Sequence, residues 1–148
     1  LATKYNGISI VPLKVKYPQG AEKQLIKAVT GREVPSGKLP IEVGCVVNNV
    51  GTAFAVYEAI QKNKPLIERV VTVTGKSLKQ PANFMVRIGT PISDLIAAVG
   101  GLPDDSGKIV SGGPMMGKAL NSLKAPVVKG TSGILIFSKN EIRLFHPI

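Results

Sequence analysis

Cysteine and histidine are nearly absent from this 148-residue sequence, and both absences exclude chemistry. The one cysteine, Cys45, permits neither an internal disulfide nor a CxxC metal site. We expect it to be a small buried hydrophobe beside Val46 and Val47. The one histidine, His146, lies in a C-terminal tail without periodicity, so we expect neither a Ser-His-Asp triad nor a histidine-based metal site. The sequence therefore predicts no catalytic residue and no metal ligand.

Aromatic residues and long apolar runs are also scarce. There is no tryptophan, and the three tyrosines and four phenylalanines do not interleave with basic residues as a base-stacking platform requires. We expect no nucleic-acid partner, despite a formal net charge of +10. No apolar run approaches the roughly 20 residues of a membrane-spanning helix. The lysine excess is spread along the chain and favours association with an acidic partner.

The first part of the chain predicts a β, α, loop, α order. Residues 8–17 read as a strand, in which Pro12 implies an edge position or a bulge. A turn at 18–20 leads into a helix that ends at Gly31, and a loop rich in Gly and Pro follows. A second helix is predicted from about residue 52 to residue 63. The chain does not begin with Met, and we expect it to be an excerpt of a longer polypeptide.

An apolar run, residues 44–52, delivers two adjacent amides to the start of that second helix. Asn48 and Asn49 precede a helix whose first N–H groups lack intrahelical partners and whose dipole favours anions. This is a plausible place to hold a phosphate-bearing ligand. Asparagine is equally typical of a helix cap followed by a turn, so local physics leaves a purely structural role open.

From residue 66 the pattern changes to that of a small α+β unit. Residues 67–74 and 82–88 predict a β-hairpin. A short helix should follow, capped by Thr90 with Pro91 at its first position. Its apolar face comprises Ile92, Leu95, Ile96 and Val99. Further strands are predicted at 108–111, 126–129 and 133–137. Strands, a helix laid across them and more strands predict a β-grasp unit over residues 66–138.

Two motifs in this region suggest phosphate or acid chemistry, and both favour a structural interpretation. Residues 112–118 fit G-x-x-x-x-G-K, but Ala119 stands where a P-loop needs a hydroxyl for magnesium. We expect a turn with two packing methionines instead. Asp104 and Asp105 lie in a segment typical of turns.

Glu22, at the start of the first helix, most simply complements the helix dipole.

Seven segments together resemble a known family. They are 16–25, 30–35, 44–52, 67–75, 87–91, 111–117 and 129–133. In this order they are similar to the C subunit of Rnf-type ion-translocating ferredoxin:NAD oxidoreductase complexes, and they cover most of the chain.

The resemblance implies three parts. Residues 1–65 would be the C-terminal part of an FMN-binding α/β domain shared with the flavoprotein subunit of respiratory complex I. Residues 66–138 would be a soluble-ligand-binding β-grasp (SLBB-type) domain. Residues 139–148 would lead toward an iron–sulfur domain. The family's glycine-rich flavin loop would precede this chain and its 4Fe-4S cysteines would follow, so we expect the fragment to be inactive alone.

The resemblance also implies which residues contact cofactors. Asn48, Asn49 and Thr52 match the segment that lies at the FMN site. Tyr17 and Glu22 match a segment near flavin and nicotinamide, in which Ala21 here replaces the first of two acids. Uncharged amides suit a flavin contact because they offer both a donor and an acceptor.

The implied function is electron transfer between ferredoxin or iron–sulfur centres, FMN and NAD(H), coupled to ion translocation. The implied partners are the other Rnf subunits, NAD(H) and an acidic ferredoxin, at the cytoplasmic face of the cell membrane. Two alternatives stay open on sequence grounds. One is a cobalamin reductase of related architecture, and the other is a non-catalytic β-grasp module that binds a small ligand or sugar.

Overall fold

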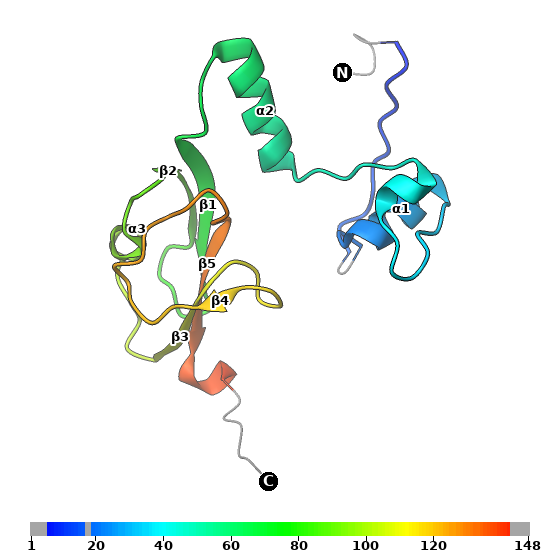
Figure 1. Cartoon of the computed structure of the whole chain (residues 1–148). Coiled ribbons are helices and arrows are strands. Elements are labelled where there is room, and N and C mark those ends of the chain that lie inside the picture. Colours follow the sequence, from blue (N-terminus) through cyan, green and yellow to red (C-terminus); the bar gives the residue numbers. More distant parts are fainter. Residues whose placement is uncertain (1–5, 17–18, 143–148) are drawn as a thin grey trace. The chain divides into compact units, whose positions relative to one another are not determined.

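The computed structural model describes residues 6–16 and 19–142. The chain divides into two compact units, Leu1–Asn49 and Val50–Ile148 (Figure 1). Among the described residues, the first unit contains helices α1 and η1, and the second contains the whole sheet.

The first unit is built around helix α1, Glu22–Thr30. Its end is as predicted, because Gly31 adopts a left-handed conformation (φ 72°) and donates its N–H to the Lys27 carbonyl. Ile26 is buried, whereas Val29 is 42% exposed. A 3-10 helix not predicted from the sequence, η1 (Pro40–Val43), packs against α1 and also ends at a left-handed glycine.

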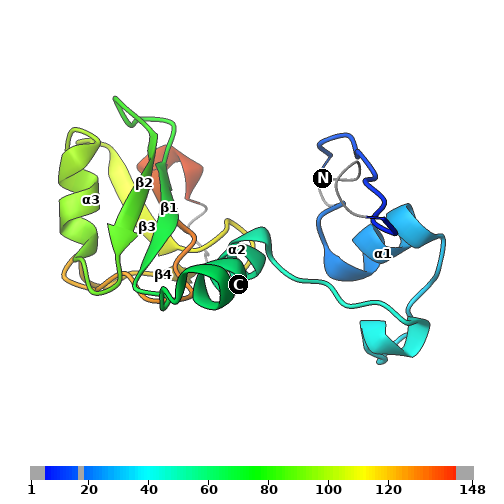
Figure 2. The ribbon, with the colours of Figure 1, turned by 90° about the horizontal axis from the view of Figure 1, so that it is seen from above.

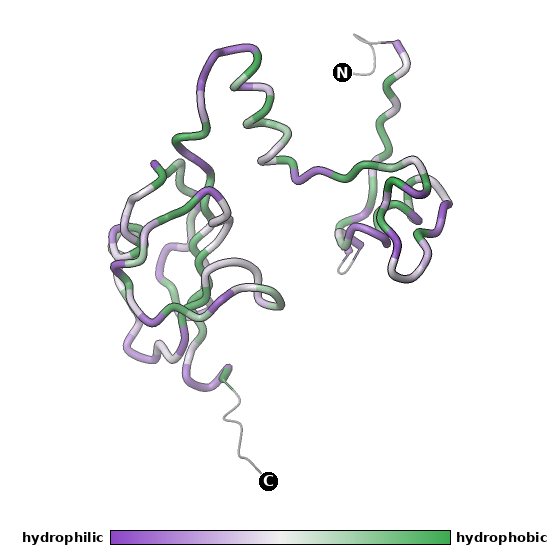
Figure 3. Tube along the Cα trace, in the orientation of Figure 1, coloured by the Kyte–Doolittle hydropathy of each residue, from purple (hydrophilic) through white to green (hydrophobic). Residues whose placement is uncertain are grey.

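The strand predicted over residues 8–17 is wrong for its described part, and Tyr17 lies outside the described residues. Residues 8–16 have no regular secondary structure, although hydrophobic residues recur along them (Figure 3). A strand needs a neighbour to pair its backbone groups, and the described part of this unit supplies none. Ile10 and Val15 accordingly remain exposed. Cys45 is only half-buried, so the prediction of a buried hydrophobe is also wrong.

The second unit follows the predicted order closely. It begins with α2, whose start lies two residues before the predicted one. Its elements are α2 (Val50–Lys62), β1 (Glu68–Thr74), β2 (Ala82–Arg87), α3 (Ile92–Ala98), β3 (Ser106–Ser111), β4 (Lys118–Ala119), β5 (Gly133–Ser138) and η2 (Lys139–Glu141). The sheet has the order β2-β1-β5-β3-β4, with β1 and β5 parallel and the other pairs antiparallel.

The core lies between one face of this sheet and α3 (Figure 2). Val71 and Val73 on β1 and Ile134 on β5 are fully buried, because alternate strand residues point to the same side. The predicted apolar face of α3 packs on them. Its four members, Ile92, Leu95, Ile96 and Val99, are all buried. The β-grasp prediction is therefore confirmed, with a helix laid across a mixed sheet.

Two local predictions near α3 are wrong for one reason, the pairing of residues 90–91 with 126–127. Pro91, not Thr90, is the N-cap, because the Thr90 carbonyl accepts the Val127 N–H at 2.8 Å instead of the first N–H of the helix. The strand predicted at 126–129 is reduced to an isolated bridge between Pro91 and Pro126. Proline has no N–H with which to continue a ladder. Val127 nevertheless supplies a fully buried core side chain.

The tail predicted to lack pattern begins with η2. Ser138 and Glu141 form a capping box there, with the Ser138 N–H donating to Glu141 Oε2 at 3.0 Å. Lys76 Nζ, from the β1–β2 connection, contacts Glu141 Oε1 at 2.8 Å and ties η2 to the hairpin. His146 lies outside the described residues.

Candidate functional site

The two asparagines lie at the end of the first unit, directly before α2 in the sequence. Asn48 and Asn49 are both exposed. They follow η1, whose position is fixed by Arg32: its Nη1 donates to the Val43 carbonyl at 2.7 Å. Gly44, the residue that ends η1, leaves room for that guanidinium, since an added Cβ would lie 3.3 Å from Nη1. The contact of Arg32 with η1 thus positions the start of the segment that carries Asn48 and Asn49.

Asn48 lines an apolar groove of about 580 Å³ in the first unit. The groove is bounded by residues 9–13, by α1 and by residues 44–48, which follow η1. Its apolar walls are Val11, Leu13, Leu25, Ile26, Val29, Val46 and Val47, and its other lining residues are Ser9, Thr30, Gly44 and Cys45. An uncharged amide beside apolar walls is the usual composition of a small-molecule site.

The other predicted site residues are not brought to this groove. Asn49 is next in sequence but does not line it, and Glu22 lies in the first turn of α1, outside the groove lining. Thr52 belongs to the second unit, in the first turn of α2. Tyr17 lies outside the described residues. Of the four proposed residues that the structure describes, Asn48 lines this groove, whereas Asn49, Thr52 and Glu22 do not.

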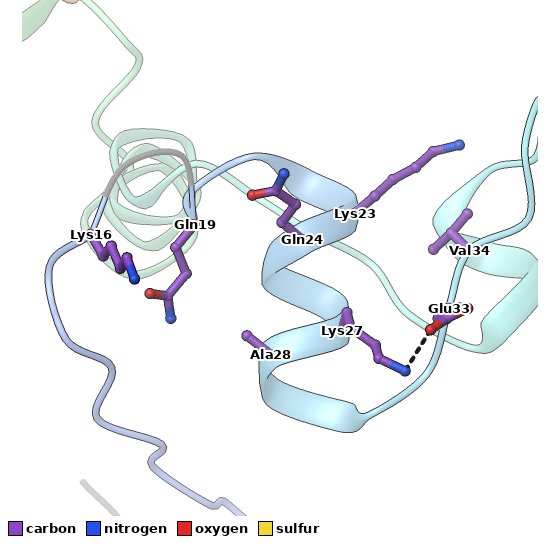
Figure 4. A pocket seen from close by; sticks show the side chains of 8 residues that line it. All are labelled: Lys16, Gln19, Lys23, Gln24, Lys27, Ala28, Glu33 and Val34. Carbon is purple, nitrogen blue, oxygen red and sulfur yellow. Dashed lines mark ion pairs between the residues drawn. The ribbon is translucent and has the colours of Figure 1, made fainter.

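A second pocket, of about 560 Å³, lies along α1 and was not predicted from the sequence. Its lining includes three lysines, Lys16, Lys23 and Lys27, and one acid, Glu33 (Figure 4). Gln19, Gln24, Ala28 and Val34 complete it. The four-residue spacing of Lys23 and Lys27 was a signal for one helix face. No local sequence pattern predicted that Lys16, which precedes α1, would line the same pocket.

Two lysines of this pocket also hold the loop after α1. Lys27 Nζ pairs with Glu33 Oε1 at 2.7 Å, and Lys23 Nζ donates to the Pro35 carbonyl at 3.2 Å. The hydrogen bond from Lys27 lowers the pKa of Glu33 below its ordinary value, and the charge of Lys27 acts in the same direction. With three ammonium groups against one carboxylate, the pocket carries net positive charge and attracts anions.

The G-x-x-x-x-G-K segment is a turn, as predicted, and not a phosphate loop. It joins β3 to β4, so a strand follows it where a P-loop has a helix. The Gly117 N–H is used within the turn, donating to the Gly113 carbonyl at 2.7 Å. The predicted packing of its methionines is wrong, because Met115 and Met116 are 76% and 91% exposed.

Neither metal ligation nor membrane crossing is apparent in the described residues. Within 6–16 and 19–142, no group of three or more His, Cys, Asp or Glu side chains could hold a metal ion. No helix in that part of the chain is long and apolar enough to span a membrane.

Comparison with known protein families gives two matches, one after the other along the chain. Residues 1–58 match the Nuo51 FMN-binding domain, and residues 70–119 match the SLBB domain. The chain therefore joins part of a flavoprotein domain to a β-grasp domain, as the fold indicates. This confirms the fold class expected from the sequence.

Known relatives extend the match over nearly the whole chain. The C subunit of the proton-translocating ferredoxin:NAD(+) oxidoreductase complex of Clostridium ljungdahlii is 53% identical over 91% of this chain and 30% of its own length. The C subunit of the Na(+)-translocating complex of Acetobacterium woodii is 48% identical over 95% of this chain and 32% of its own length. The C subunit of the ion-translocating oxidoreductase complex of Rhodobacter capsulatus is 46% identical over 90% and 25%.

Over nearly its whole length the chain is similar to one segment of the C subunits of ion-translocating oxidoreductase complexes. It spans about a third or less of the length of these curated relatives.

Proposed function

We propose that the protein containing this chain carries electrons between ferredoxin or iron–sulfur centres, FMN and NAD(H), as a subunit of an ion-translocating complex. The observation that carries this proposal is the 53% identity over 91% of the chain to a subunit named for that reaction. The relatives' names favour this function over a cobalamin reductase or a sugar-binding module. Its location would be peripheral, at the cytoplasmic face of the membrane, together with the other subunits of the complex.

In this proposal the chain supplies the later part of a flavin site. Asn48, Asn49 and Thr52 would contact FMN, and Tyr17 and Glu22 would lie near flavin and nicotinamide. The exposed, uncharged amides of Asn48 and Asn49 fit such a contact, since they accept and donate hydrogen bonds without adding charge. FMN, when bound, supplies the exchange between hydride and single-electron transfer, while the protein binds and orients it.

The proposal also assigns the parts of the chain. Residues 1–65 would end the FMN-binding domain, residues 66–138 would form the SLBB-type domain, and residues 139–148 would lead toward the iron–sulfur domain. The 4Fe-4S clusters would be held outside this chain, which contains a single cysteine.

The test is flavin binding by the full-length subunit and by this chain alone. We expect the purified full-length subunit to hold about one FMN, released on denaturation, and to lose its flavin absorbance when NADH is added anaerobically. We expect the 148-residue chain to bind FMN weakly. A full-length subunit without flavin would contradict the proposed function. Micromolar or tighter binding by the short chain would contradict only the claim that its site is incomplete.

A further inference from the structure

The three methionines of the chain are all exposed, and all belong to the β-grasp unit. Met85 is 60% exposed on β2, and Met115 and Met116 are 76% and 91% exposed in the β3–β4 turn. Val70, which pairs with Met85 across β1 and β2, is 53% exposed. Exposed apolar side chains that share one surface, unlike scattered ones, mark a candidate contact site.

Register places Val70 and Met85 on the sheet face opposite α3. Val71 and Val73 point to the α3 side, so Val70 and its partner Met85 point away from it. Leu135 pairs with Val110 on this same face and is half-buried. We call Val70, Met85, Leu135, Met115 and Met116 the open face.

The β3–β4 turn lies over this side of the sheet. An added Cβ on Gly117 would overlap Val110, and Val110 is buried although it points away from α3. Figures 1 and 2 show α3 and the turn on opposite sides of the sheet. The turn therefore covers one end of the open face and leaves its two methionines outermost.

The turn holds its methionines on a fixed backbone. Gly112 adopts φ 109°, which side chains rarely allow, and its N–H donates to the Gly133 carbonyl at 2.8 Å. The Gly117 N–H closes the turn on Gly113. Apolar side chains presented on an ordered turn lose little backbone entropy when they bind. Methionine also adapts its shape to the partner, which is why it is common at protein contacts.

Basic residues lie at the edge of this apolar area. Arg87 on β2 and Lys108 on β3 fall on the same face by register, and both are exposed. Glu68, the acid of that face on β1, is already paired with Lys64 at 2.5 Å. An apolar centre with a positive rim is complementary to an apolar patch bordered by carboxylates.

We propose that the open face is a docking surface for another protein subunit of the same complex, one with an apolar patch bordered by acidic side chains. This inference rests on the proposed function, because it needs a multisubunit complex. A second copy of this chain and another domain of the same polypeptide are the competing occupants.

The test is oxidation footprinting of the methionines by hydrogen peroxide, read by mass spectrometry. Exposed methionine is converted to its sulfoxide, so the rate reports access to each sulfur. We expect Met85, Met115 and Met116 to be oxidised readily in the isolated full-length subunit and several-fold more slowly in the assembled complex. Equal rates in the two preparations would overturn the proposal.

The competing occupants give different patterns. Protection already present in the isolated subunit at every concentration indicates another domain of the same chain, and protection that grows with concentration indicates a second copy. Either pattern overturns the proposal. The same preparations separate it from the proposed function: an assembled complex that reduces flavin but leaves the methionines open contradicts docking alone, whereas a subunit that joins no complex contradicts both.

A double variant, Met115→Ser with Met116→Ser, tests the surface independently. We expect it to lower the yield of the assembled complex while leaving thermal unfolding of the subunit unchanged, because both side chains are exposed. Leu102→Ser is the matched control, since Leu102 is 40% exposed in the α3–β3 connection, outside the open face. An unchanged yield with the double variant, or an equal loss with the control, would overturn the proposal.

Discussion

Gly117 closes the β3–β4 turn, and replacing it with alanine should destabilise the β-grasp unit. An added Cβ would lie 2.6 Å from the Gly113 carbonyl oxygen and 2.9 Å from that of Ser111. It would also overlap the side chain of Val110. The valine can rotate away, but the two oxygens belong to the backbone of the turn and of β3. The substitution therefore has to displace the turn from the sheet.

Overpacking of this kind costs about 1–3 kcal/mol. For a unit of about 100 residues, each kcal/mol lowers the thermal midpoint by about 4–8 °C, so we expect a loss of roughly 5–20 °C. Gly113 provides the control within the same turn, since no atom lies within 4 Å of its added Cβ and its φ is not positive. Gly113→Ala should change the stability by no more than about 0.5 kcal/mol.

The assay is thermal unfolding of the 148-residue chain, followed by circular dichroism. If Gly117→Ala melts with the wild-type chain, or if the two substitutions lower the midpoint equally, the close packing of the turn on the sheet is refuted.

Three further predictions concern the core, the pH dependence and the loop after α1. Ile134→Ala should cost about 2–5 kcal/mol in urea unfolding, because the side chain is fully buried, whereas Val128→Ala, at a 53% exposed position, should cost under about 0.5 kcal/mol. The hydrogen bond from Lys76, with those from Ser138, lowers the pKa of Glu141. A carboxylate whose pKa is lowered in the folded state stabilises the fold at every pH above its unfolded pKa of about 4.3, and this stability is lost as the pH falls through the folded pKa. The melting temperature should therefore drop on acidification, and it should drop less in Glu141→Gln. If that variant keeps the full acid dependence, the ion pair is not its source. Arg32→Ala should speed hydrogen exchange of residues 40–44 several-fold, because it removes the donor to the η1 carbonyl. Unchanged exchange would show that η1 is held by other contacts.

Patterns within one segment predicted the fold of the second unit well. The alternation along β1 and β2 and the spacing of Ile92, Leu95 and Ile96 each depend on a single element, so the sequence carries them directly. Errors arose where structure depends on a neighbour. Residues 8–16 have strand composition but no described strand beside them, and β4 has only two residues, too few for any alternation.

The candidate site was less predictable than the fold. The helix after Asn48 and Asn49 follows from local spacing, but the groove beside Asn48 depends on how residues 9–13 approach α1. The lysine pocket likewise needs Lys16 from one segment and Lys27 from another. The exposure of Met115 and Met116 reversed the expectation from their apolar character, because the surrounding glycines fix the turn without them.

The segment before α2 is proposed to form part of a flavin site. The decisive measurement is the FMN content of the full-length subunit in which Asn48→Ala and Asn49→Ala are combined. The control is Asn121→Ala, which replaces an exposed amide in the β-grasp unit. We expect the double variant to lose most of its flavin while the control keeps it. Unchanged flavin occupancy in the double variant would show that these two amides do not hold the flavin.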